Sequence, residues 1–497
     1  MNKTTKTIIV AVFLMIFSFA LDKGYPYAKA YFLPKYSISY YHYSMPSDLK
    51  AMDVSNLPPA TAVPVLIYHG ILSEKDALNT SEDTFIAQME MLKREGYQTI
   101  TLDQLNGFYN GTYTLPPKPI ILTFDDGRKD SFYTTDDIFK QLGFSAVLFV
   151  SSNKALNNDP FYLSWDELAA IRNTGRWDLE AHGRNGHDKP VVDELGNRGH
   201  YLTSLIWDTK LQRSETIDEY KARVNQDFVN SITDLETNLG FQPYYYAIPF
   251  NDYGNSSYSY GGAREYTYDL RKKYFNLSFA ISPDPYVYAY QDKHFLNRYE
   301  VFNASADELR QTLERYAPLA LPYSADFVSY DEGRWTKKWG LEQEESGGIE
   351  VGAASDTTGG TVVLNGSYFW QDYQMSATID WIKGQNLYVL ARYSDDQNNL
   401  GCNISRDEIR LEQTINGQTK DLLELHNETP IPLGRVQVGA RVKGDTLECL
   451  VNGQPVGFAI YSPADKLKNG AIGFKLWDPV LNTSLAEVVA VSAEELK

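Results

Sequence analysis

The sequence predicts a protein of two parts, an α/β domain with parallel strands followed by an all-β sandwich. In the first part, short apolar runs alternate with stretches of helical periodicity. From about residue 321 onward, helical periodicity fades, and strand-like runs with Asn-Gly pairs take its place. The chain has 497 residues, which is more than a single hydrophobic core usually serves, so two or three domains are expected.

In the first part, strands and helices are expected in regular alternation. Continuous apolar runs predict buried strands, and apolar residues spaced along one face predict helices. Such alternation is typical of a parallel sheet, open or barrel-like, whose catalytic groups lie at the carboxyl ends of the strands. The expected strands are 63–68, 119–124, 144–150, 178–181 and 244–248, and the expected helices are 83–95, a stretch ending at 142, 165–173 and 215–239.

In the second part, Asn-Gly pairs flanked by alternating apolar residues favour two-residue hairpin turns. The runs 409–415 and 447–451 each precede such a pair. We therefore expect residues 321–497 to form a sandwich of antiparallel strands. The four pairs begin at Asn365, Asn416, Asn452 and Asn469.

Composition excludes some classes of function. The net charge is -18 and the pI is about 4.9, and such an acidic protein repels nucleic acid, so no nucleic-acid partner is expected. Tyrosine is frequent, with 36 residues, and its ring suits contacts with sugars as well as half-buried strands. Cys402 and Cys449 are the two cysteines, and the sequence alone leaves open whether they pair.

The amino terminus has the pattern of an export segment. Lys3 and Lys6 precede an uncharged run over 7–21, as in a signal peptide, while an uncleaved membrane anchor fits as well. We assign residues 1–30 to this segment and 31–60 to a spacer. Both alternatives place the protein outside the cytoplasm, either anchored at the cell surface or secreted. The oligomeric state stays open.

Two adjacent carboxylates follow the strand expected at 119–124. Asp125 and Asp126 stand in the sequence TFDDG, and neighbouring side chains point in different directions. One carboxylate can therefore bind a cation while the other stays free. Taken alone, the same residues also suit an ordinary turn or a helix cap.

Two histidines follow the strand expected at 178–181. His182 and His187 lie in the glycine-containing sequence EAHGRNGH, in a chain that has only seven histidines. Together with one aspartate they would form a two-His, one-carboxylate metal site with open positions for water and substrate. Because both motifs lie at expected strand ends of one domain, a shared site is favoured over surface polarity.

These motifs resemble those of the polysaccharide deacetylases, also called NodB-homology domains or carbohydrate esterase family 4. The resemblance covers roughly residues 61–305 and implies a distorted β/α barrel of NodB type over residues 61–320. It implies that Asp125 is the general base and that Asp126, His182 and His187 hold a divalent metal. Zinc is the family's usual ion, and Co²⁺, Ni²⁺ or Fe²⁺ also fits such ligands.

Departures from the common family pattern narrow the implied substrate. Four residues rather than three separate the two histidines, and the segment 247–250 (AIPF) lacks the arginine that orients the base. These features, with residues 64–70 and 215–224, are similar to the branch that deacetylates poly-β-1,6-N-acetylglucosamine in biofilms. The resemblance also implies that Pro249, Phe250 and Asp252 contact substrate.

The sequence leaves the general acid and several functions open. His69 follows the first strand and His294 lies near the family's last motif, so either histidine is a candidate acid. Arg298 could hold a carboxylate in the pocket, but a structural ion pair is favoured. Peptidoglycan N-acetylglucosamine deacetylase, O-acetyl polysaccharide esterase and an inactive glycan-binding module remain alternatives to an exopolysaccharide N-deacetylase. The sandwich at 321–497 is similar to concanavalin or laminin-G jelly rolls, and it either binds carbohydrate or acts as a spacer.

Overall fold

The computed structural model describes residues 41–74, 76–289, 291–327, 333–345, 347–462 and 467–496. The chain divides into two compact units, Met1–Gln311 and Thr312–Lys497, and each is described by itself. The export segment expected at 1–30 and the first part of the expected spacer lie outside the described residues. Among the helices of the described residues, none combines the length and the apolar character that a membrane crossing requires.

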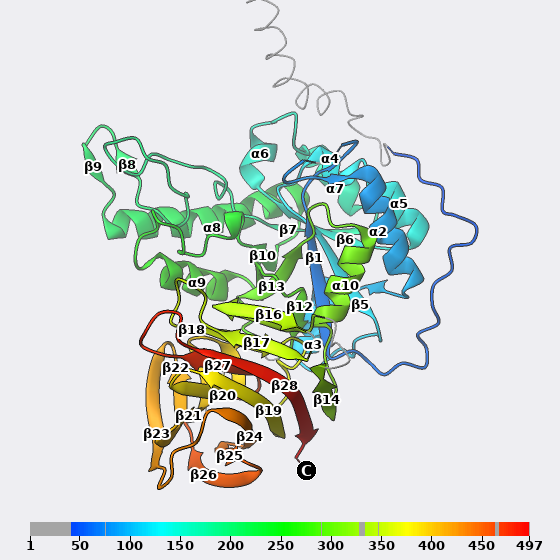
Figure 1. Ribbon diagram of the computed structural model, residues 1–497. Helices are drawn as coiled ribbons and strands as arrows, with labels where there is room; N and C mark the ends of the chain where they lie inside the picture. Colours follow the sequence, from blue (N-terminus) through cyan, green and yellow to red (C-terminus); the bar gives the residue numbers. More distant parts are fainter. Residues whose placement is uncertain are drawn as a thin grey trace, which may run out of the picture. The chain divides into compact units, whose positions relative to one another are not determined.

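The first unit is built around a closed barrel of parallel strands (Figure 1). The strands follow the order β1-β13-β11-β10-β7-β6-β5, and β5 pairs with β1 again to close the ring. The fold predicted from sequence, a distorted β/α barrel, is confirmed. The barrel strands are β1 (Ala62–Tyr68), β5 (Pro119–Phe124), β6 (Ala146–Val150), β7 (Trp177–Ala181), β10 (Tyr245–Ala247), β11 (Leu277–Ile281) and β13 (Leu296–Glu300).

Helices surround the barrel (Figure 1), two short strands extend its sheet, and four others form separate two-stranded sheets. Serine or threonine caps begin α2, α3, α7 and α8, and left-handed glycines end α5 and α8. These signals explain why the limits of α2, α5, α7 and α8 were predictable, whereas α3 was not expected. The helices are α2 (Glu82–Arg94), α3 (Leu102–Tyr109), α4 (Lys129–Phe132), α5 (Asp136–Leu142), α6 (Ser152–Leu156), α7 (Trp165–Arg172), α8 (Ile217–Leu239), η1 (Pro249–Asn251), α9 (Ala263–Tyr274) and α10 (Ala306–Tyr316). The short strands are β2 (Ile71–Leu72), β3 (Thr80–Ser81), β4 (Gln98–Thr99), β8 (Trp207–Asp208), β9 (Arg213–Ser214) and β12 (Tyr286–Tyr288).

The second unit is a sandwich of two antiparallel sheets, as predicted. One sheet has the order β16-β17-β28-β19-β24-β25-β26 with β14 beside β28, and the other has the order β15-β18-β27-β20-β21-β22-β23. Side chains from both sheets form one hydrophobic core. The strands are β14 (Tyr323–Asp326), β15 (Trp335–Trp339), β16 (Leu341–Glu345), β17 (Gly348–Gly352), β18 (Gly359–Leu364), β19 (Tyr373–Lys383), β20 (Asn386–Asp395), β21 (Asn398–Ser405), β22 (Glu408–Ile415), β23 (Gln418–His426), β24 (Gly434–Lys443), β25 (Thr446–Val451), β26 (Gln454–Ile460), β27 (Ala471–Trp477) and β28 (Leu485–Glu495).

Two of the four Asn-Gly pairs form the expected hairpin turns. Asn416 and Asn452, each with its glycine, connect β22 to β23 and β25 to β26, and all four residues have positive φ. The pairs at Asn365 and Asn469 do not connect paired strands, because β18 and β27 pair with strands distant in the chain. An Asn-Gly pair therefore marked a hairpin only twice.

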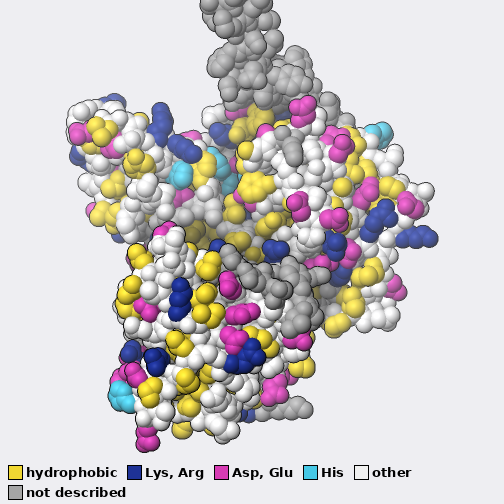
Figure 2. Space-filling model, viewed as in Figure 1, with side chains coloured by type: hydrophobic (Ala, Val, Ile, Leu, Met, Phe, Trp, Pro, Cys, Tyr) yellow, Lys and Arg dark blue, Asp and Glu magenta, His cyan; other side chains and the backbone are white. Residues whose placement is uncertain are grey.

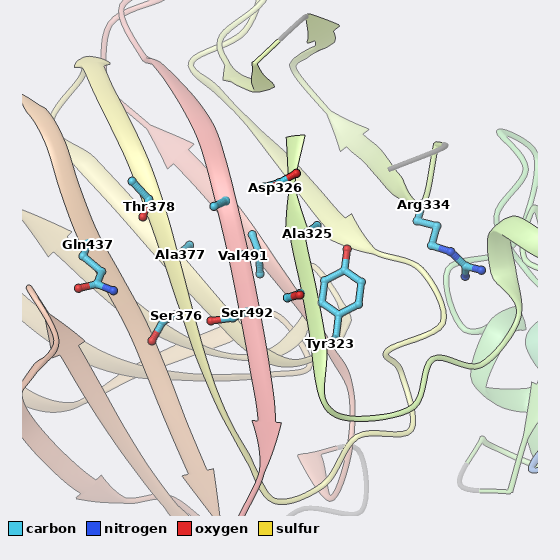
Figure 3. A pocket seen from close by; sticks show the side chains of 12 residues that line it. Tyr323, Ala325, Asp326, Arg334, Ser376, Ala377, Thr378, Gln437, Val491 and Ser492 are labelled. Carbon is cyan, nitrogen blue, oxygen red and sulfur yellow. The ribbon is translucent and has the colours of Figure 1, made fainter. Parts of the chain in front are cut away.

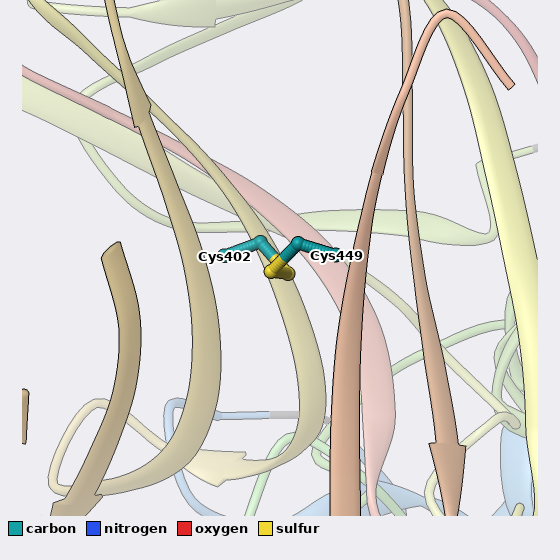
Figure 4. The surroundings of a disulfide bond; sticks show 2 residues. All are labelled: Cys402 and Cys449. Atoms are coloured by element: carbon teal, nitrogen blue, oxygen red, sulfur yellow. A yellow bond between two sulfur atoms is a disulfide. The ribbon is translucent and has the colours of Figure 1, made fainter. Parts of the chain in front are cut away.

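Cys402 and Cys449 form a disulfide in the core of the sandwich (Figure 4). Cys402 lies on β21 and Cys449 on β25, so the bond joins the two sheets. Their Cα atoms are 5.8 Å apart and the residues are separated by 47 positions.

Candidate active site

The Asp-Asp-Gly turn directs its two carboxylates to different sides. β5 ends at Phe124, and Asp126 and Gly127 both have left-handed backbones, with φ of 74° and 79°. A left-handed aspartate is uncommon and costs conformational energy, so such a turn persists only where the surroundings fix it. As a result, Asp125 points into the barrel toward Arg298, and Asp126 points toward the histidines that follow β7, two strands away in the barrel.

Asp126, His182 and His187 converge at the carboxyl ends of the strands. One ligand atom of each residue lies within 4.8 Å of the other two. Asp126 Oδ1 is 3.1 Å from His187 Nε2 and 3.7 Å from His182 Nε2. The structure thus brings together the three residues that the sequence pattern grouped as metal ligands.

The surroundings of these atoms fit a divalent cation. Asp126 Oδ1 is buried without a hydrogen-bond partner in the described structure, which is costly unless a cation neutralises it. His182 Nδ1 is 2.8 Å from the carbonyl oxygen of Ala247, and His187 Nδ1 is 3.0 Å from Ser151 Oγ. These contacts orient both rings with Nε2 toward the shared space, as is usual for metal-binding histidines. Burial lowers the pKa of His187 to about 4 although Asp126 opposes the shift, which favours the neutral, ligating form.

Arg298 binds Asp125 in a bidentate ion pair. Nη1 donates to Oδ1 at 2.7 Å and Nη2 donates to Oδ2 at 2.9 Å, and both side chains are almost fully buried. Burial would raise the pKa of Asp125, but Arg298 and then His182 outweigh it and hold the pKa well below its usual range. Residues 247–250 lack an arginine, as the sequence shows, and β13 supplies one to Asp125 from another part of the chain.

His69 and His294, the two candidate acids, lie at opposite ends of the barrel strands. His69 directly follows β1 at the carboxyl edge, and its Nδ1 is 3.5 Å from Glu300 Oε1. His294 precedes β13 at the amino edge, where its carbonyl oxygen accepts a hydrogen bond from Ser278. Burial raises the pKa of Glu300 and His69 opposes the shift. Sequence reasoning missed Glu300, although it lies two residues after Arg298 and so on the same side of β13.

The segment after β10 forms a wall beside His187. Phe250 has a left-handed backbone, with φ of 56°, and its ring is 40% exposed. The centroid of this ring lies 4.7 Å from the ring centroid of His187. The ring also stacks on that of His200, with the two centroids 4.6 Å apart. Asp252 accepts hydrogen bonds from His200 and Thr203 at 2.5 Å each. It is buried and positions His200, on which the Phe250 ring stacks.

Helix α8 holds the loop that carries the two histidines. Asp227 accepts hydrogen bonds from the backbone N–H groups of Arg184 and Asn185, at 3.1 and 2.8 Å. Gly186 lies so close to Pro249 that an added Cβ would meet the proline ring at 2.6 Å. The sequence could not identify Asp227, because its helical position is 40 residues from the loop and has no motif of its own.

Part of the chain is similar in sequence to known polysaccharide deacetylases. Residues 112–268 match the family model described as polysaccharide deacetylase. Poly-beta-1,6-N-acetyl-D-glucosamine N-deacetylase of Escherichia coli O157:H7 is 22% identical over 224 residues, which are 42% of this chain and 33% of that protein. The protein of the same name from Escherichia coli K12 is 25% identical over 179 residues, which are 33% of this chain and 26% of that protein. The chain thus spans about a third or less of these relatives.

Solved structures with similarity to the chain include two bacterial enzymes. A de-N-acetylase from Aggregatibacter actinomycetemcomitans is 20% identical and has a TM-score of 0.44, over 51% of this chain and all of that one. The deacetylase domain of BpsB from Bordetella bronchiseptica is 20% identical and has a TM-score of 0.40, over 49% of this chain and 99% of that one.

Proposed function

Because the chain carries a polysaccharide deacetylase domain, we propose that it removes N-acetyl groups from an extracellular polysaccharide of the poly-β-1,6-N-acetylglucosamine type. The observation that carries this proposal is the convergence of Asp126, His182 and His187 beside the buried, ionised Asp125. We further propose that the domain extends over residues 61–320 and that the sandwich forms a separate domain over 321–497.

A divalent metal fits the active site of this proposal, with Asp126, His182 and His187 as its protein ligands. When bound, such an ion supplies Lewis-acid polarisation of the acetyl carbonyl group and makes water a stronger nucleophile at neutral pH. Zinc is our first choice, and Co²⁺, Ni²⁺ or Fe²⁺ would fit the same ligand types.

Asp125 and His69 divide the proton transfers in this proposal. Asp125 accepts a proton from the water molecule whose oxygen forms the new bond to the acetyl carbon. Arg298 keeps that carboxylate ionised and fixes its orientation by two hydrogen bonds. His69 in its protonated form donates to the amide nitrogen as the C–N bond breaks, and the products are acetate and a free amine on the sugar. We choose His69 over His294 because it lies at the same strand ends as Asp125.

The wall formed by Pro249 and Phe250 would contact the sugar. Phe250 is partly exposed beside His187, so its edge is available to an apolar sugar face. Asp252 is buried and bound by His200, which supports a positioning role rather than direct contact with substrate.

Further observations support the proposed polymer and the proposed location outside the cytoplasm. The names of the two curated relatives support poly-β-1,6-N-acetylglucosamine over peptidoglycan. A disulfide between Cys402 and Cys449 suits an oxidising compartment outside the cytoplasm. Acidic and basic side chains are interspersed over the face in Figure 2, without a continuous basic area that a polyanionic substrate would favour.

Acetate release tests the proposal. The purified chain is incubated with poly-β-1,6-N-acetylglucosamine, peptidoglycan and O-acetylated xylan, before and after chelation and after zinc is restored. We expect acetate from the first polymer, its loss on chelation and its recovery with zinc. Release from peptidoglycan or xylan alone would overturn the proposed substrate, and release that chelation leaves unchanged would overturn the metal site.

A further inference from the structure

The outer face of one sandwich sheet carries a groove of about 630 Å³ (Figure 3). We propose that this groove binds a stretch of the same acetylated polysaccharide, as a binding site on the second unit; this rests on the proposed function of the first. The groove crosses β14, β28, β19 and β24. It is lined by Tyr323, Ser324, Ala325, Asp326, Arg334, Ser376, Ala377, Thr378, Gln437, Ala490, Val491 and Ser492.

The strand register aligns hydroxyl groups in a row across the groove. Ser324 on β14 pairs with Ser492 on β28, and Ser492 pairs with Ser376 on β19. The next residue in this row is Gly439 on β24, which has no side chain to obstruct the floor. Because paired residues of neighbouring strands project to the same face, the three serines point into one continuous depression.

A second row runs parallel to the first. Asp326 pairs with Ala490, which pairs with Thr378, which in turn pairs with Gln437. This row contributes a hydroxyl, an amide and a carboxylate around one small apolar residue. Within the described part of the chain, the hydroxyls of Ser324, Ser376, Ser492 and Thr378 make no hydrogen bond to protein.

Longer side chains border the two rows on both sides. Along β19, Gln374 lies two residues before the first row, and it accepts hydrogen bonds from Arg441, which also binds Glu448. Asp380 lies two residues after the second row and forms a bidentate ion pair with Arg435, at 2.8 and 2.7 Å. These side chains are tied to one another, so they form fixed borders rather than ligands for the floor.

The lining suits a neutral, hydroxyl-rich chain. Hydroxyl and amide groups both donate and accept hydrogen bonds, as the hydroxyl and acetamido groups of a sugar require. The lining has one carboxylate and one guanidinium, so their formal charges sum to zero. The floor has neither an apolar patch for a protein partner nor a basic cluster for nucleic acid. Four strands about 4.8 Å apart span about 14 Å, the length of a short oligosaccharide.

Binding by the full-length chain tests the groove. The chain carries Asp125→Asn to prevent turnover, and its affinity for poly-β-1,6-N-acetylglucosamine is measured with Thr378→Tyr or with Thr446→Tyr added. Thr378 lies in the groove, and Thr446 lies on the same face of the same sheet but outside it, so the two substitutions are chemically matched. We expect Thr378→Tyr to weaken binding about tenfold or more by filling the groove, and Thr446→Tyr to leave binding unchanged. Equal affinities of the Thr378→Tyr and Thr446→Tyr chains would overturn the proposed binding site in the groove. No binding by the Asp125→Asn chain itself would overturn it as well.

Removal of hydroxyls keeps the shape of the groove and tests its chemistry. The triple change Ser324→Ala, Ser376→Ala and Ser492→Ala should weaken binding about tenfold, because the lost hydrogen bonds are not replaced. Unchanged affinity would contradict recognition through these hydroxyls.

Turnover separates failure of the groove from failure of the proposed function. In the chain with an intact Asp125, Thr378→Tyr should raise KM for the polymer while kcat for a short N-acetylglucosamine oligomer stays unchanged. If the unaltered chain releases no acetate from the polymer or from the oligomer, the proposed function fails. The binding comparison still tests whether the groove binds the polymer.

Discussion

Asp125 and Asp126 are neighbours in the chain, and both carboxylates lie near His182, but otherwise they meet different partners. The left-handed backbone of Asp126 turns one carboxylate toward the histidines and leaves the other with Arg298. The sequence predicted the division between the two residues, because adjacent side chains diverge. It predicted an ion pair for Arg298 but not Asp125 as its partner, because the two positions are 173 residues apart and no local pattern connects them.

At the residue scale, Arg298→Lys should separate orientation from charge. Lysine keeps the positive charge but cannot form the bidentate pair with Asp125. We expect kcat to fall about 10²-fold because the base is displaced, while zinc stoichiometry stays unchanged. Steady-state kinetics and metal analysis on the same sample check this, and a chain with normal kcat would show that charge alone suffices.

Substitution of the two histidines tests the choice of acid. His69→Gln should lower kcat by about 10²–10⁴-fold, because the leaving amine loses its proton donor. His294→Gln is the matched control and should retain activity, since His294 lies at the other end of the strands. The opposite ranking in acetate release would reject His69 as the donor.

At the scale of elements, β13 shows where sequence patterns fail. Its sequence LNRYE does not have the continuous apolar character of β1 or β6, because Arg298 occupies a buried position inside the barrel. Arg298 lies over the ring of Phe149, 5.2 Å from its centroid, which replaces the apolar packing expected there. The polar residues that make β13 functional are therefore the ones that hide it from hydrophobic periodicity.

Helix α8 should contribute to metal affinity through the histidine loop. Asp227→Ala removes the acceptor for two backbone N–H groups between His182 and His187. We expect zinc affinity to fall about 10–100-fold, the usual effect of losing support behind metal ligands. Competition with a fluorescent zinc chelator measures this.

Asp234→Ala on the same helix is the control for Asp227. It removes contacts with the side chains of Arg184 and Ser152 but leaves the backbone of the loop bound. A similar loss of zinc affinity in both variants would mean that general destabilisation, rather than loop position, is responsible.

At the scale of the whole molecule, each of the two units has its own core, and the disulfide strengthens the second. The pair closes a loop with a sequence separation of 47, for which loop entropy gives a stabilisation of about 4 kcal/mol. Cys402→Ala with Cys449→Ala should therefore lower the guanidinium midpoint of the sandwich. Five of the eight tryptophans lie in residues 335–477, so tryptophan fluorescence reports mainly this transition. An unchanged midpoint would contradict a stabilising bond.

The central claim is that Asp125 acts as the base beside a metal held by its neighbour. Acetate release from poly-β-1,6-N-acetylglucosamine is compared between the unaltered chain, Asp125→Asn and Asp218→Asn, with zinc content measured on the same samples. Asp218 is an exposed aspartate in the first turn of α8 and serves as the matched control. We predict that Asp125→Asn loses activity by about 10²–10⁴-fold with full zinc content, and that Asp218→Asn changes neither. Full activity in Asp125→Asn would contradict the claim.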